Sequence, residues 1–179
     1  MKKCIFLLMS AAEFIAYAGS VMDVDYGLRS SASIWDAKRF LRKSIGCGGL
    51  SIRKCTNFDK FYDRVTDRLK HHLPVYTRGN NSNGVGHAYV IDGFVEQKKY
   101  IDDFAMRRRS LLHVNWGWAR GRGDDPDYNW NGWFLAEVLN SNEKLEDFYP
   151  DEPMIQYGSG PGIYDGRAIT ITYRVPDWR

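Results

Sequence analysis

Two short apolar segments constrain the fold of this 179-residue chain more than any other feature. Residues 84–93 read GVGHAYVIDG, with a histidine at the start of an apolar run and glycines on both sides. Residues 113–118 read HVNWGW, with Asn115 and Trp116 at the end of a second run. Runs of this length, rich in β-branched and aromatic residues and bounded by glycine, predict β-strands. The chain is therefore expected to bring one histidine and one Asn-Trp pair to a sheet.

The first part of the chain predicts helices, and the remainder predicts mostly strands. Ser33 precedes a run with helical periodicity, and Thr56 or Asn57 can cap a further helix with one apolar face. Helices are predicted over residues 5–18, 34–44 and 58–69, and strands over 50–54, 74–77, 87–95, 98–104, 111–118, 133–135 and 169–175. This order indicates an α+β fold. We expect a single domain over residues 1–179, helical over 1–72 and sheet over 73–179.

The residue types suggest thiol-protease chemistry. A catalytic thiol must become a thiolate, and a histidine such as His87 can accept its proton. An amide such as Asn115 can orient the imidazole, and the indole of Trp116 can shield that hydrogen bond from water. Gly84 and Gly86 would let a substrate backbone approach closely. Taken alone, however, a histidine ahead of an apolar run, such as His87, is more often a structural residue than a catalytic one.

Several segments together resemble the streptopain family of bacterial cysteine peptidases. That family shows a Gly-Gly-His-Ala-Phe-Val-Ile-Asp-Gly strand followed by a His-Val-Asn-Trp-Gly-Trp strand. Upstream, Val24-Asp25-Tyr26-Gly27 with the serines at 30–33 is similar to the family's Met-Asp-Tyr-Gly segment and its serine-rich loop, and residues 73–76 to the strand that leads to the histidine. The order and approximate spacing agree from Leu8 to Phe134.

The resemblance implies a papain-like cysteine peptidase fold, represented here mainly by its C-terminal β lobe with a few preceding helices. His87, through Nδ1, would pair with the cysteine sulfur, Asn115 would hold the other ring nitrogen, and Trp116 would cover that bond. Substrate would bind along Gly84, Val85, Gly86 and Trp118. Asp92 is expected to stabilise a turn before Gly93.

The resemblance also implies proteolysis of a polypeptide substrate at internal bonds, without cofactor or metal. Such peptidases are secreted or belong to the cell envelope, and a prosegment or inhibitor protein is the partner they imply.

The nucleophile is the missing part. The family's Gly-Cys-Val-Ala-Thr type of motif does not occur, and Cys4, Cys47 and Cys55 have different neighbours. We expect the chain to begin downstream of the catalytic cysteine. One alternative is a catalytically dead homologue that binds peptides or a partner protein. A second alternative is a carbohydrate-binding module that uses Trp116, Trp118, Trp130 or Trp133 as stacking platforms.

Composition excludes several other classes. The net charge of +3 gives no reason to expect nucleic acid as a partner. The three cysteines include no Cys-x-x-Cys pair, so neither a zinc site nor a disulfide framework is predicted. The N-terminus imitates a secretory signal, but Glu13 interrupts its apolar stretch, and that stretch is too short to span a membrane.

Overall fold

The computed structural model describes residues 10–26, 30–55, 57–80, 86–100, 106–117, 131–136 and 168–175. The chain divides into two compact units. The first consists of Met1–Leu50 with Tyr173–Arg179, and the second of Ser51–Thr172. The prediction of a single domain stays a prediction. Among the described residues, no helix combines the length and the apolar character that a membrane span requires.

Helix α1, Ala11–Val21, begins with a reciprocal cap at Ser10. The Ser10 hydroxyl accepts a hydrogen bond from the Glu13 backbone N–H at 3.3 Å, and the Glu13 carboxylate accepts one from the Ser10 N–H at 2.7 Å. These bonds satisfy two N–H groups that a helix start leaves without partners. The helix predicted over residues 5–18 is thus present but ends at Val21, and residues 5–9 lie outside the described residues.

Helix α2, Ile34–Phe40, starts where the sequence predicted. The Ser33 hydroxyl accepts from the Asp36 backbone N–H at 3.1 Å, which confirms Ser33 as the cap. A π-helical turn, Leu41–Ile45, follows, and Gly46 ends it with φ of +83°. Glycine suits this left-handed position because it has no Cβ to clash with the preceding carbonyl.

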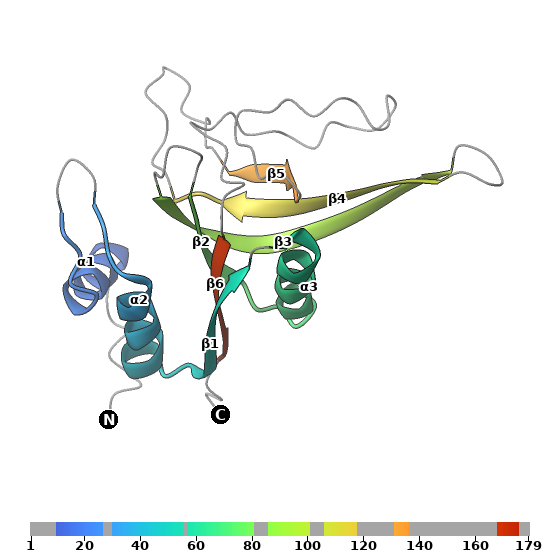
Figure 1. Cartoon of the computed structure of the whole chain (residues 1–179). Helices are drawn as coiled ribbons and strands as arrows, with labels where there is room; N and C mark the ends of the chain where they lie inside the picture. The colour runs from blue at the N-terminus through green and yellow to red at the C-terminus, as the bar shows by residue number, and fades with distance from the viewer. Residues whose placement is uncertain are drawn as a thin grey trace, which may run out of the picture. The chain divides into compact units, whose positions relative to one another are not determined.

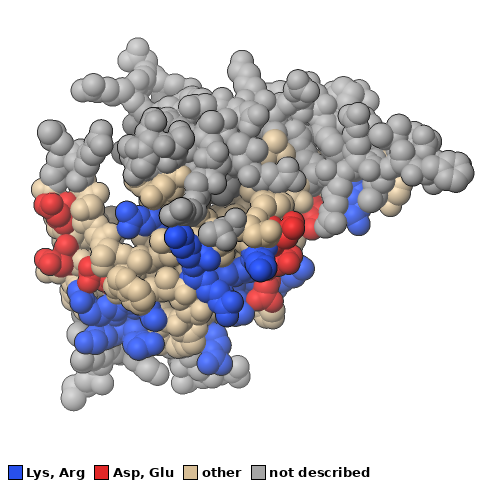
Figure 2. All heavy atoms as spheres, in the orientation of Figure 1, with Lys and Arg blue, Asp and Glu red and all other residues tan. Residues whose placement is uncertain are grey.

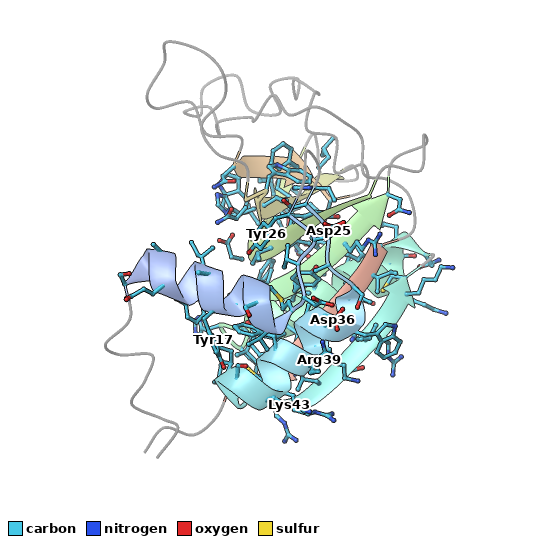
Figure 3. The ribbon with its side chains drawn as sticks, turned by 90° about the vertical axis from the view of Figure 1, so that its left-hand side faces the viewer. Tyr17, Asp25, Tyr26, Asp36, Arg39 and Lys43 are labelled. Atoms are coloured by element: carbon cyan, nitrogen blue, oxygen red, sulfur yellow. The ribbon has the colours of Figure 1, made fainter. Side chains whose placement is uncertain are left out.

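Helices α1 and α2 pack through aromatic rings. The rings of Phe14 and Tyr17 on α1 lie 6.1 and 6.3 Å from the ring of Phe40 on α2. The Tyr17 hydroxyl donates to Ser44 Oγ at 3.3 Å. Figure 3 shows α1 and α2 side by side, with Tyr17 on α1 and Asp36, Arg39 and Lys43 on the α2 side. Aromatic contacts therefore hold this pair together.

Within the described residues, six strands form one sheet in the order β1-β6-β2-β3-β4-β5 (Figure 1). Strands β2, β3, β4, β5 and β6 pair antiparallel with their neighbours. This confirms the predicted α+β class; the papain-like arrangement stays an expectation. The bounds are β1 Gly48–Cys55, β2 Val75–Asn80, β3 Gly86–Tyr100, β4 Met106–Asn115, β5 Gly132–Leu135 and β6 Ala168–Arg174.

Strand β3 is longer than predicted and runs unbroken through the region where two strands were expected. It pairs with β4 from Val90 opposite Asn115 to Tyr100 opposite Met106. The separate strand predicted over 98–104 is therefore wrong. Its first residues continue β3, because ladder hydrogen bonds to β4 hold the backbone extended whatever the polarity of the side chains.

Helix α3, Phe58–Leu69, covers the sheet and completes the core of the second unit (Figure 1). Asn57 caps it, because its Oδ1 accepts from the Lys60 N–H at 3.1 Å. The helix buries one face against β2 and β3, as its 3.6-residue periodicity predicted. The core consists of Phe61, Tyr62, Val65, Leu69, Val75, Tyr89, Ile91, Leu112, Val114, Trp116, Phe134, Ala136 and Ala168.

Candidate functional site

His87 is the second residue of β3, opposite Gly79 of the neighbouring β2. On the other side of β3, the register with β4 starts at Val90 opposite Asn115, where β4 ends. Because the two strands run antiparallel, the chain that leaves β4 after Asn115 continues toward the His87 end of β3. The sheet thereby brings His87 to the same end as the adjacent residues Asn115 and Trp116, which follow it in the sequence by almost thirty positions.

The His87 ring is held by a main-chain group. Its Nε2 lies 2.7 Å from the carbonyl oxygen of Trp116. A carbonyl can only accept, so Nε2 carries the hydrogen and donates. In the neutral ring, Nδ1 then holds the lone pair and is the basic nitrogen. Nδ1 is also the nitrogen that the family resemblance assigned to the cysteine sulfur.

Asn115 occupies a different position in this network from the one expected. Its side-chain Oδ1 accepts a hydrogen bond from the Gly117 N–H at 3.0 Å, and Asn115 itself is exposed. Gly117 has a left-handed φ of +69°, and the chain makes a tight turn there immediately after β4. The hydrogen bond from the Gly117 N–H to the Asn115 carboxamide stabilises this turn. The turn places the Trp116 carbonyl at the ring nitrogen that was assigned to Asn115. A direct role for Asn115 at His87 stays a prediction.

Trp116 is completely buried and is held at both main-chain polar groups. Its indole lies 4.7 Å from the Tyr89 ring and 5.3 Å, edge-on, from the Phe134 ring. The backbone N–H of Trp116 donates to Asn131 Oδ1 at 2.9 Å, and the Trp116 backbone carbonyl accepts from His87 Nε2. Asn131 was not predicted, because nothing in its local sequence indicates a partner 15 residues away. The His87 and Trp116 rings are 6.1 Å apart.

The surroundings of His87 favour its neutral form. Burial lowers the pKa of His87, and the hydrogen bond to the Trp116 carbonyl opposes this only in part. Desolvation disfavours a charged imidazolium, so the ring is neutral and able to accept a proton at neutral pH. This protonation state suits a general base.

The lowered pKa predicts how stability depends on pH. Between its folded pKa and the ordinary value of about 6.5, His87 binds more protons in the unfolded state than in the folded state. Its contribution to stability is therefore present above about pH 6.5 and is lost as the pH falls. We expect the free energy of unfolding to drop more from pH 7.5 to pH 5 in the wild type than in His87→Gln. Urea unfolding at both pH values measures this; equal drops would contradict it.

Only one of the four predicted substrate-binding residues lies within the described structure. Gly86 opens β3 and is exposed, opposite Asn80. A Cβ at this position would come within 3.0 Å of Asn80 Oδ1 and 3.3 Å of Arg78 Nε. Gly84, Val85 and Trp118 lie outside the described residues. Their role stays a prediction.

The two described cysteines are free thiols with different environments. Cys47 is 4% exposed, and burial raises the pKa of its thiol, which opposes formation of the thiolate. Cys55 is partly buried beside the core of the second unit. Cys4 lies outside the described residues. Within the described part of the chain, no three side chains gather to hold a metal ion.

A second histidine forms an ion-pair geometry that the sequence did not indicate. His113 Nδ1 lies 2.5 Å from Asp92 Oδ1, and its ring packs edge-on against Trp133 at 5.2 Å. The prediction of a turn at Asp92 is wrong, because β3 continues through this residue, with a bulge between Ile91 and Gly93. The bulge shifts the register of β3 by one residue against β4. Asp92 therefore contacts β4 and does not stabilise a turn.

Comparison with known proteins places this chain in a family. The family model described as the peptidase C10 family matches residues 6–128. That range includes His87, Asn115 and Trp116 and covers well over half of the chain. No curated protein matches the sequence.

Proposed function

Because the chain belongs to the peptidase C10 family, the streptopain family, we propose that it is a cysteine-type endopeptidase with a papain-like fold in which His87 is the catalytic base and acid. A peptidase acts on polypeptides, so the substrate class follows from the family. The observation that carries the assignment of His87 is the hydrogen bond from its Nε2 to the Trp116 carbonyl, which leaves Nδ1 as the basic nitrogen.

In the proposed mechanism, Nδ1 of His87 takes the proton of a cysteine thiol, and the thiolate attacks the scissile carbonyl. The imidazolium then gives this proton to the leaving amine. The Trp116 carbonyl accepts from Nε2 throughout and stabilises the charged ring. The buried Trp116 indole excludes water from one side of this bond. Asn115 completes the proposed catalytic set as an orienting residue.

Substrate binding and location extend the proposal. Gly84, Val85 and Gly86 precede the histidine, where a substrate backbone would need close approach, and Trp118 would line the cleft next to the scissile bond. Like other peptidases of this type, the protein is proposed to act outside the cell or in the cell envelope.

A second candidate function is peptide or partner binding without cleavage. It is favoured by the environment of Cys47, whose buried thiol has a raised pKa. The carbohydrate-binding alternative loses one of its four tryptophans, because Trp116 is completely buried and cannot stack against a sugar. Trp118 and Trp130 lie outside the described residues.

Hydrolysis of an unfolded protein by the purified chain tests the proposal. The assay is run under reducing conditions, with and without prior alkylation of the thiols. Because the family's cysteine motif does not occur in the sequence, turnover requires that Cys4, Cys47 or Cys55 serve as the nucleophile. In that case alkylation abolishes turnover, and mass spectrometry of the alkylated chain identifies the nucleophile. Absence of turnover from a folded sample would overturn the proposal for this chain and favour the binding function. Turnover that resists alkylation would exclude a cysteine nucleophile.

A further inference from the structure

A cavity of about 610 Å³ lies between β1 and α3, within the second unit. Pockets for small ligands span roughly 300–1,000 Å³, so the volume suits a small molecule. Figure 2 shows lysine and arginine side chains gathered over β1 and α3. Five of the eight lining residues are cationic. The lining consists of Arg53, Lys54, Cys55, Lys60, Asp63, Arg64, Asp67 and Arg68.

Arg64 is fixed in this cavity by three hydrogen bonds. Its Nε donates to Thr170 Oγ1 at 2.7 Å, and its Nη2 donates to Thr172 Oγ1 at 3.0 Å and to the Ser51 carbonyl at 2.9 Å. Thr170 and Thr172 are two residues apart on β6, so both hydroxyls project from the same face of the sheet. A guanidinium bound along one edge in this way keeps a set orientation, with the two N–H groups of Nη1 left for a further acceptor.

The positive charge of Arg64 is not neutralised by these partners. All three acceptors are uncharged oxygens, and within the described part of the chain no carboxylate forms an ion pair with Arg64. Asp67 in the same cavity pairs with Arg68 at 2.9 Å. Burial lowers the pKa of Arg64, and the charges of Arg53 and Arg68 act in the same direction. Arginine stays protonated nonetheless, so an anion in the cavity would relieve an existing electrostatic cost.

We propose that this cavity is a binding site for a small polyanion that carries phosphate groups. Arg64 is its preorganised anchor, and Arg53 and Lys60 supply further charge from β1 and α3. A fixed guanidinium combined with flexible ammonium groups suits the several oxygens of a phosphate chain. Asp63 and Asp67 line the cavity along α3. A compact ligand contacts these carboxylates less than an extended acidic peptide would, which favours the small molecule.

Titration of tripolyphosphate into the full chain by isothermal calorimetry tests the proposal. We expect binding that weakens as salt rises, with a dissociation constant raised about tenfold or more by Arg64→Gln. The matched control is Arg42→Gln, an exposed residue outside the cavity, which removes the same charge and should leave binding unchanged. Arg64 also joins α3 to β6, so its replacement can disturb the fold. The double variant Arg53→Gln, Lys60→Gln changes only side chains that lie at the surface, and it should weaken binding of tripolyphosphate as well.

The thiol of Cys55 provides a second readout, because it lines the cavity. Tripolyphosphate should slow alkylation of Cys55, with the buried Cys47 as the internal reference in the same digest. Absence of binding, equal weakening by Arg42→Gln, or tighter binding of a hexaglutamate peptide than of tripolyphosphate would each overturn the proposal. These measurements do not involve proteolysis, so the outcome is independent of the proposed peptidase activity.

Discussion

Replacing Trp116 by alanine is expected to lower the free energy of unfolding by about 3–5 kcal/mol, a large part of the stability of a domain of this size. The indole is completely buried and packs against Tyr89 and Phe134 in the core between α3 and the sheet. Its removal loses the burial of a large aromatic surface and leaves a cavity that the surrounding strands cannot close. Urea unfolding followed by circular dichroism measures the change.

Trp35→Ala is the matched control for this prediction. Trp35 lies on α2 and is 64% exposed, so its loss should change the free energy of unfolding by no more than about 0.5 kcal/mol. A loss below 1 kcal/mol for Trp116→Ala would mean that Trp116 is not a core residue. Trp116→Ala should also loosen the His87 ring. The ring is held by the Trp116 carbonyl, and the packing of the Trp116 side chain helps to fix that carbonyl in place.

Replacing His87 by alanine is expected to reduce alkylator-sensitive proteolysis by about 10²–10⁴-fold while the chain stays folded. Without the imidazole, no described group at this position takes the thiol proton or returns it to the leaving amine. Initial rates on an unfolded protein substrate, compared at equal folded concentration, measure the loss. Asn115→Ala should cost less, because the Trp116 carbonyl also holds the ring nitrogen that this amide was expected to bind.

His71→Ala is the matched control for loss of a histidine. His71 is exposed just after the end of α3, where its ring contacts the Asp67 carbonyl at 2.7 Å. Its replacement should leave proteolysis unchanged. Unchanged proteolysis in His87→Ala would show that the base has been assigned wrongly, whatever the effect on stability.

The sequence by itself determined the elements whose signals are local. Ser33 and Asn57 cap helices because a side-chain oxygen can reach an N–H two or three residues away. The buried face of α3 follows from its own periodicity, and the β-strands that contain His87 and Asn115 follow from short apolar runs between turn residues. Family membership was also legible in these segments, because their order along the chain carries it.

Only the tertiary structure decided which groups meet. The ring of His87 bonds to the carbonyl of a residue 29 positions away, and Trp116 is held by Asn131. Arg64 reaches Thr170 across 106 positions, because β6 enters the sheet between β1 and β2. The continuation of β3 through a bulge at Asp92 likewise depends on its pairing with β4. Such contacts depend on strand order and register, and these are set by the packing of distant segments, which no local pattern contains.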